Sequence, residues 1–245
     1  MALGILIGLG FLSSAWAGPP FETDDPEPVE YHHWEIYFGG TLLNLQNISN
    51  GTLPFLELNY GPLPDVQLTL TEQMAFNLPG GNSGYYGYGD TLAGMKYRFL
   101  HESGDIPQAA FFPQVNIPTG DASRGLGAGQ TQFLLPLWLQ KSWGPWTTFG
   151  GAGYWINPGP GNQNWVFLGW EIQRDLAPFF TLGGEVFYRS ANMTGQNDSV
   201  GFNLGGFIHF DNVNHIVFSA GRDFVQPEYQ FTGYLAYEWT FPTGE

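Results

Sequence analysis

The chain has 245 residues, with 22 acidic and 7 basic side chains and a formal net charge of −15. An acidic surplus of this size excludes nucleic acid as a favourable partner, because nucleic acids bind basic surfaces. The chain has no cysteine. If it is exported, its fold must be held by core packing or by closure of a hydrogen-bond ladder instead of by disulfides.

Residues 1–17 are typical of a secretory signal peptide. Leu3 to Leu12 are apolar, and Ala15-Trp16-Ala17 fits the small-x-small cleavage pattern, although no Lys or Arg precedes the apolar run. The run is shorter than the roughly 20 residues that a spanning helix needs. No other uninterrupted apolar segment approaches that length, which excludes a helical membrane protein.

Residues 18–31 follow as an acidic, proline-rich segment, beginning GPPFETDDPEPVE. Proline removes backbone donors and fixes φ, so we expect neither a helix nor a central strand here. The segment is therefore predicted to be irregular, and residues 32–245 form the folded domain.

Candidate strands then recur at nearly regular spacing to the end of the chain. Twelve are predicted: 32–45, 53–61, 66–77, 88–100, 108–118, 129–141, 146–156, 165–173, 179–190, 199–210, 215–224 and 229–241. Many of them are near ten residues long. A soluble all-β domain is the alternative, but its strands would be nearer five or six residues.

The last strand shows the pattern most clearly. Phe231, Leu235, Tyr237 and Trp239 alternate with mostly polar residues, so one face meets an apolar medium and the other a polar one. Repeated about a dozen times behind an export signal, this alternation predicts an all-β fold, an antiparallel transmembrane β-barrel with lipid outside and a polar lumen inside.

The connections alternate between tight turns and longer, glycine-rich loops. With an even number of strands, both termini lie at the end with the tight turns, which in outer-membrane barrels faces the periplasm. This predicts a protein of the bacterial outer membrane. Outer-membrane lipid, lipopolysaccharide and the barrel-assembly machinery are then its expected partners.

Eight charged residues fall on the faces predicted to point inward. They are Glu35, Glu57, Lys96, Arg98, Glu171, Glu185, Arg189 and Glu238. A Lys or Arg facing lipid at mid-depth costs about 2–4 kcal/mol, so this placement is expected whatever the function. The residues are interpreted either as a salt-bridge network that braces the wall or as the lining of a permeation path, and the two are compatible.

Glu35 and Glu238 are predicted to be neighbours, because closure brings the first and last strands together. Two carboxylates there need a cation or a shared proton. Arg98 is the nearest candidate by depth, and its contact would have to cross the lumen.

The acidic run of Glu22, Asp24, Asp25 and Glu27 allows three interpretations. It is a solvated tail, a short hatch folded into the lumen against Lys96 and Arg98, or a calcium site. The prolines leave no regular ligand spacing for calcium. Neighbouring histidines on a strand point to opposite faces, so no metal site is predicted at 32–33, and no cofactor is expected.

A hydrolase is the rival from another class. His215 and Ser219 share the inward face but are four residues apart on one strand, about 13 Å, which is beyond the reach that nucleophilic catalysis needs. No Gly-x-Ser-x-Gly motif occurs after the leader. We therefore predict no enzymatic activity, with an outer-membrane hydrolase and a closed structural barrel as the alternatives.

The sequence also resembles a family of outer-membrane proteins described as "MetA-pathway of phenol degradation" or as transporters. The resemblance spans most of the chain after the leader. It is carried by 18–28, His33-Trp34-Glu35, Gly89-Asp90, Gly94, 96–99, 118–121, 125–127, 136–141 and 150–155. The resemblance implies a barrel that takes up aromatic or other small apolar compounds. It brings no catalytic or binding residues. Together with the inward charges, it predicts a passive channel for small, neutral or aromatic solutes.

Overall fold

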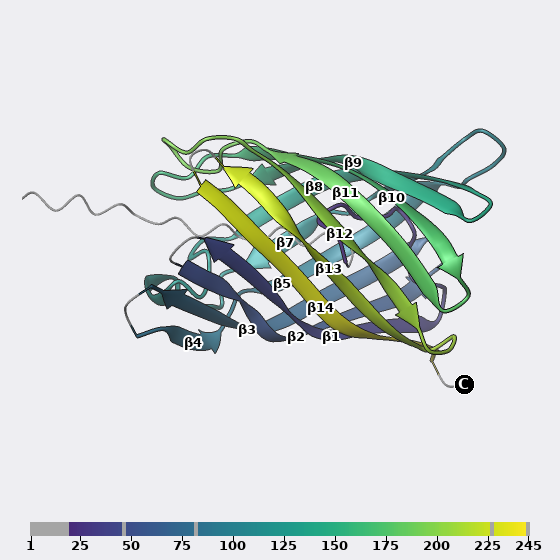
Figure 1. Cartoon of the computed structure of the whole chain (residues 1–245), viewed down its shortest axis with the longest axis horizontal. Coiled ribbons are helices and arrows are strands. Elements are labelled where there is room, and N and C mark those ends of the chain that lie inside the picture. The colour runs from purple at the N-terminus through teal and green to yellow at the C-terminus, as the bar shows by residue number, and fades with distance from the viewer. Residues whose placement is uncertain (1–19, 46–47, 81–82, 226–227, 244–245) are drawn as a thin grey trace, which may run out of the picture.

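The chain folds into an antiparallel β-barrel whose strands are tilted around a common interior (Figure 1). The computed structural model describes residues 20–45, 48–80, 83–225 and 228–243. Its strands are β1 (His33–Leu45), β2 (Ile48–Leu63), β3 (Val66–Pro79), β4 (Tyr85–Tyr88), β5 (Thr91–Leu100), β6 (Gln108–Phe111), β7 (Gln114–Ile117), β8 (Gln132–Trp143), β9 (Trp146–Ile156), β10 (Trp165–Ala177), β11 (Phe180–Arg189), β12 (Ser199–His209), β13 (Asn214–Val225) and β14 (Glu228–Pro242). One 3-10 turn, η1 (Ala122–Arg124), lies in a loop. Among these residues, no helix is long and apolar enough to span a membrane.

The barrel closes between its first and last strands. β1 pairs with β14 along its full length, from His33 opposite Pro242 to Leu45 opposite Gln230. The other strands follow one another around the wall in chain order, although β4 pairs only with β3. Closure removes the two long edges that an open sheet would expose, so the wall can lie in lipid.

The fourteen segments occupy twelve positions around the barrel. β4 and β5 are two parts of one strand, since both pair with β3. β6 and β7 are likewise parts of one strand between β5 and β8. The prediction of an antiparallel, twelve-stranded transmembrane barrel is therefore confirmed.

Some predicted boundaries were wrong. The second strand was expected at 53–61 but extends over Ile48–Leu63, which shortens the loop predicted for 46–52. The fifth was expected to be continuous but is interrupted at Phe112 and Pro113. The register is the same on both sides, with Phe111 opposite Leu137 and Gln114 opposite Leu134. The interruption therefore inserts no residue into the wall.

The alternation of side chains separates an apolar exterior from a buried interior. In β12 and β14, Leu204 and Leu235 are 62% and 60% exposed, whereas their neighbours Asn203 and Ala236 are each 3% exposed. The residue period of two puts successive side chains on opposite faces. An apolar outer surface of this kind is the one that a bilayer requires, and it places the chain in an outer membrane.

The two ends of the barrel differ. The end that carries His33 and Pro242, here called the turn end, has short connections such as the one between Leu63 and Val66. The opposite end, here called the loop end, carries longer connections, of which 118–131 includes η1. This difference provides the depth scale for the interior.

We expect the folded chain to resist SDS at room temperature and to migrate differently on a gel after boiling. A closed ladder has no edge at which unfolding can begin, so detergent alone opens it slowly. Semi-native electrophoresis of the chain without residues 1–17 measures this. Equal migration before and after boiling, together with solubility in the absence of detergent, would contradict the membrane barrel.

Candidate functional site

All eight charged residues selected from the sequence occupy inward positions. They are Glu35 in β1, Glu57 in β2, Lys96 and Arg98 in β5, Glu171 in β10, Glu185 and Arg189 in β11, and Glu238 in β14. They do not form one network. Lys96, Glu185 and Arg189 instead bind residues 20–30, here called the lumen segment, which lies inside the barrel (Figure 1).

The lumen segment passes through much of the depth of the barrel. Glu22 meets the loop end of β11, Asp24 meets the middle of β5, and Val29 donates its N–H to Gln67 at the turn end of β3 (2.9 Å). Thr23 and Asp24 are completely buried. Residues 1–19 lie outside the described part of the chain, so the predicted signal peptide and cleavage site stay predictions.

Glu185 holds the beginning of the segment. Its carboxylate accepts the backbone N–H groups of Glu22 (2.7 Å) and Thr23 (2.9 Å) and the hydroxyl of Thr23 (2.7 Å). Asn203 donates to the same carboxylate at 2.6 Å. Hydrogen bonds to an ionised acceptor are about twice as strong as neutral ones, so Glu185 is the main anchor of this end.

Arg189 adds an ion pair beside that anchor. Its guanidinium contacts the carboxylate of Glu22 and that of Asp223, the latter at 2.6 Å. The same group lies 4.7 Å from the centre of the Phe187 ring. A buried arginine with two carboxylates and an aromatic face is well compensated for its desolvation.

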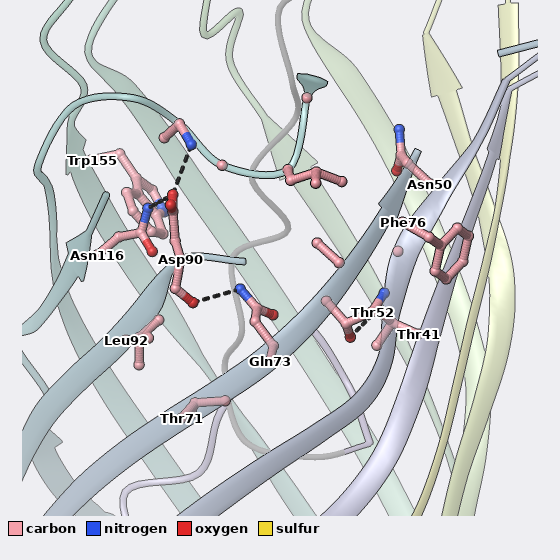
Figure 2. A pocket seen from close by; sticks show the side chains of 16 residues that line it. Thr41, Asn50, Thr52, Thr71, Gln73, Phe76, Asp90, Leu92, Asn116 and Trp155 are labelled. Carbon is pink, nitrogen blue, oxygen red and sulfur yellow. Dashed lines mark hydrogen bonds between the residues drawn. The ribbon is translucent and has the colours of Figure 1, made fainter. Parts of the chain in front are cut away.

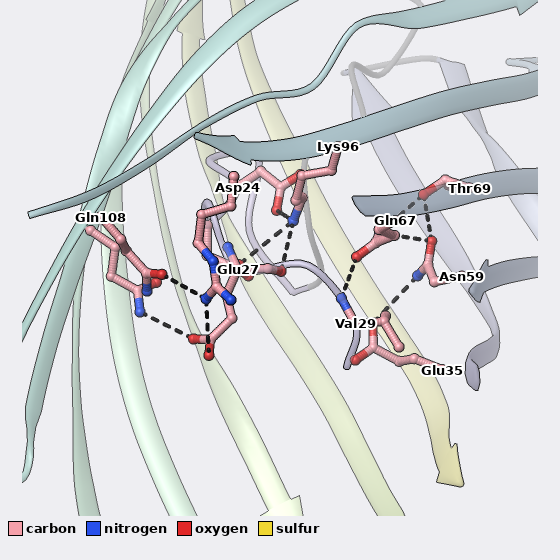
Figure 3. Close-up of polar contacts among 12 residues, drawn as sticks. Asp24, Glu27, Val29, Glu35, Asn59, Gln67, Thr69, Lys96 and Gln108 are labelled. Carbon is pink, nitrogen blue, oxygen red and sulfur yellow. Dashed lines mark hydrogen bonds and ion pairs between the residues drawn. The ribbon is translucent and has the colours of Figure 1, made fainter. Parts of the chain in front are cut away.

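Lys96 holds the middle of the segment, as Figure 3 shows. Its ammonium lies 3.0 Å from Oδ1 of Asp24 and 3.6 Å from Oδ1 of Asp25, and it donates to the carbonyl of Glu27 at 3.4 Å. The ammonium is almost entirely buried. One positive charge therefore faces two carboxylates of the lumen segment.

Arg98 is bound mainly to the wall. Its Nε and one terminal nitrogen donate to Oδ1 of Asp65 (2.9 and 2.8 Å), and the other terminal nitrogen donates to Gln108 (3.1 Å). Glu27 lies farther away, at 3.9 Å. Partial burial tends to raise the pKa of Asp65. The hydrogen bonds and positive charge of Arg98 outweigh this effect and keep that pKa below its ordinary value.

The contact expected between Arg98 and the pair Glu35 and Glu238 is therefore not made. Asp65 lies in the turn that enters β3, next to β5 in the wall, so Arg98 is satisfied without crossing the lumen. The contact was predicted from the depth of Arg98 along its strand. Depth does not determine which residue lies nearest in the neighbouring strands around the barrel.

Two wall glycines make space for the segment, and neither was selected from the sequence. A Cβ at Gly169 would overlap the hydroxyl of Thr23, and a Cβ at Gly61 would overlap the carbonyl of Glu30. Gly183, an inward glycine of β11, makes space for a different neighbour. A Cβ there would overlap the carboxylate of Glu171, so this glycine leaves no open space in the lumen.

Part of the inner wall is aromatic, where a polar lumen was predicted. The buried cluster comprises Phe112, Leu134, Trp138, Trp155, Trp165, Phe167 and Phe187. Within it, the rings of Trp155 and Trp165 are stacked with their centres 5.3 Å apart. In β8 both faces are apolar, since Leu134 and Trp138 are buried inside while Phe133 and Leu137 are exposed outside. Strict alternation of apolar and polar residues does not describe this side.

A cavity of about 110 Å³ lies toward the loop end (Figure 2). Asp90 accepts the backbone N–H groups of Gly120 (3.0 Å) and Ala128 (2.7 Å) and the side-chain amide of Asn116 (2.9 Å). It thereby fastens the 118–131 loop to the wall. Trp155 closes one side of this cavity, so the aromatic cluster reaches it.

The residues of the hydrolase alternative do not meet. Ser219 donates its hydroxyl to the carbonyl of Pro20, and His215 pairs through Nδ1 with Nδ1 of His209 at 2.9 Å. Ser219 is therefore used to hold the lumen segment. Within the described ranges, no three acidic, histidine or cysteine side chains gather as metal ligands would.

No family model matches the sequence, and no curated protein matches it. Solved structures do match. An outer-membrane channel from Pseudomonas putida F1 is similar with a TM-score of 0.69 at 14% identity, over 88% of this chain and 97% of that one. The KdgM porin has a TM-score of 0.58 at 8% identity, over 84% and 99%. The translocator domain of the autotransporter NalP from Neisseria meningitidis has a TM-score of 0.57 at 11% identity, over 86% and 90%.

At these identities the likeness shows the fold. The chain is an outer-membrane β-barrel of the kind found in channels and porins, and the finer resemblance to an aromatic-uptake family stays a prediction.

Gly169→Val should expel the lumen segment from its seat. The valine would overlap Thr23 and break its bonds to Glu185, and a loss of about 1.4 kcal/mol of docking free energy corresponds to about a tenfold larger undocked population. In a Phe21→Cys background, labelling by a water-soluble maleimide should accelerate by at least that factor. The chain has no other cysteine.

Gly184→Val is the matched control, since Gly184 lies next in β11 to the inward Glu185 and faces Leu204 on the lipid side. Equal labelling rates in the two valine variants would contradict the docking of Thr23 against Gly169.

Proposed function

We propose that the chain is a channel for passive diffusion of small solutes across the outer membrane, and that the lumen segment restricts it. The observation that carries the proposal is the position of residues 20–30 inside a closed barrel, bound to β3, β5, β11 and β13. A barrel with eight strands is filled by its own side chains and one with sixteen is open, so twelve strands leave a narrow interior that a short segment can control.

The lining of the lumen favours the passage of small, neutral solutes, and of aromatic ones in particular. A solute that crosses from the loop end passes the cavity beside Trp155, and the same aromatic cluster continues along β8 to β11. Aromatic rings attract one another through offset and edge contacts. The surplus of carboxylates in the interior disfavours anions, because the low-dielectric wall concentrates their field.

Orientation and partners follow from the same proposal. The turn end faces the periplasm, and the loop end faces outward. Lipopolysaccharide surrounds the loop end, and the barrel-assembly machinery inserts the chain. A hydrolase is the weaker alternative, since Ser219 and His215 are each engaged elsewhere. A closed structural barrel would show no conductance in any variant.

Deleting residues 18–30 should raise single-channel conductance, because it removes the segment from the lumen. Lys96→Ala should produce most of the increase that the double substitution of Lys96 and Arg98 produces. Lys96 binds the segment at 3.0 Å, whereas Arg98 reaches it only at 3.9 Å and stays with Asp65.

Lys141→Ala is the control for loss of one positive charge. Lys141 pairs with Glu102 at the turn end (2.9 Å) and does not contact the segment. Unchanged conductance in both the deletion and Lys96→Ala would reduce residues 18–30 to a tail without influence on permeation.

Liposome swelling tests the solute class. With solutes of matched size, the neutral and cationic ones should permeate faster than the anionic one, and the difference should shrink at high salt because ions screen the interior charge. Fastest permeation by the anion would refute the electrostatic part of the proposal and leave the barrel intact.

A further inference from the structure

A second cavity lies between the lumen segment and the turn end. It encloses about 480 Å³, within the range of small-molecule sites. Its lining is strongly acidic. The carboxylates that line it are Asp24, Asp25, Glu27, Glu30, Glu35, Glu57 and Glu238. Among the described lining residues, Lys96 is the only lysine or arginine.

The positive charges near the cavity are already used by the lumen segment and the turn. Lys96 pairs with Asp24 and Asp25, and Arg98 pairs with Asp65 and more distantly with Glu27. Glu30 is mostly exposed and lies 3.7 Å from His33. Three less exposed carboxylates remain, those of Glu35, Glu57 and Glu238. They come from β1, β2 and β14, which are adjacent around the barrel. Within the described chain, no ion pair reaches any of the three.

Hydrogen bonds satisfy two of these carboxylates in part. Glu57 accepts from Asn59 (3.0 Å) and Thr71 (3.3 Å), and Glu35 accepts a longer bond from Asn59 (3.4 Å), which Figure 3 shows. These donors belong to the wall and are neutral. They lower the cost of burying the carboxylates but do not cancel their charge.

Glu238 is the least satisfied of the three. Its Oε1 accepts a bond of 3.4 Å from Thr240, while its Oε2 is buried and has no hydrogen-bond partner. The side chain lines the cavity and is only 7% exposed. The amide oxygens of Gln114 and Gln173, which line the same cavity, are also buried without partners. Several strong acceptors therefore line one cavity. The donors that line it beside them, such as the hydroxyl of Tyr37 and the side-chain amide of Gln114, are neutral.

Part of the remaining lining is apolar. Leu92, Phe112, Phe149 and Phe207 contribute to the same cavity. A metal ion would need at least three close ligands, and the described acidic and histidine side chains form no such group. A ligand with one cationic donor group and an apolar body matches both parts of the lining.

We propose that this cavity binds small organic cations, namely primary ammonium compounds with an aromatic or short aliphatic body. The ammonium supplies three N–H donors, of which one bonds Oε2 of Glu238, and the body lies against the phenylalanines. This assignment rests on the proposed channel, which delivers the ligand from the loop end, and names a class of solute that the channel would retain.

Equilibrium binding to the chain without residues 1–17, in nanodiscs of zwitterionic lipid, tests the assignment. The probes for titration calorimetry are 2-phenylethylammonium, 2-phenylethanol and 3-phenylpropanoate, with empty nanodiscs as the blank. The ammonium should bind at least about tenfold more tightly than the alcohol, because a hydrogen bond between charged groups in a buried site exceeds a neutral one by that much. The carboxylate should bind most weakly.

Glu238→Gln should reduce the affinity for the ammonium by about tenfold and leave that for the alcohol nearly unchanged. Glu102→Gln removes the same charge at a turn outside the cavity, where Glu102 pairs with Lys141, and should leave both affinities unchanged. The heat-dependent gel shift confirms that each variant is folded.

Equal affinities for ammonium and alcohol, or equal effects of the two glutamine substitutions, would overturn the assignment. Binding at equilibrium does not require conduction. A chain that binds the ammonium but never conducts refutes the channel alone, and a chain that conducts without this preference refutes the cation site alone.

Discussion

Pairing between β1 and β14 is the constraint on which the rest of the molecule depends. Inside a bilayer, each unpaired backbone group costs several kcal/mol, so a sheet of this length has to close. Once His33 to Leu45 lie against Gln230 to Pro242, every strand has a fixed inner and outer face. The interior can then hold buried carboxylates and ammonium groups that would be too costly against lipid.

Closure also concentrates charge, and the protein distributes that charge unevenly. On one side, Glu185, Arg189 and Lys96 are satisfied by backbone and acidic groups of residues 20–30. On another, Glu35, Glu57 and Glu238 face a cavity where Lys96, the lysine that lines it, is paired with Asp24 and Asp25. Aromatic side chains from β8 to β11 cover much of the wall between the loop end and the middle. The interior is thus a sequence of different environments and not a uniform aqueous pore.

The fold could be predicted from the sequence because a period of two is a local property that each strand shows by itself. The inward position of Glu185 follows from the same rule. Its role as an acceptor for the N–H groups of Glu22 and Thr23 does not, since that contact joins residues more than 160 positions apart and depends on how the barrel closes. Charge complementarity suggested Lys96 and Arg98 as partners of the acidic segment. It could not suggest Glu185, because this carboxylate binds the backbone N–H groups of the segment and has the same charge as its side chains. Gly169 likewise has meaning only once Thr23 lies against it.

The lumen segment precedes β1 in the chain, yet its anchors include Glu185 in β11 and Ser219 in β13. These strands come late in the chain, so they are synthesised and exported after most of the other strands. The first residues of the domain therefore reach their final place only when the last strands have been inserted. Thr23 and Asp24 are consequently buried only in a barrel whose assembly is complete. A barrel that stalled before its C-terminal strands were in place would still present an extended acidic segment to periplasmic proteases, which could remove the defective copy.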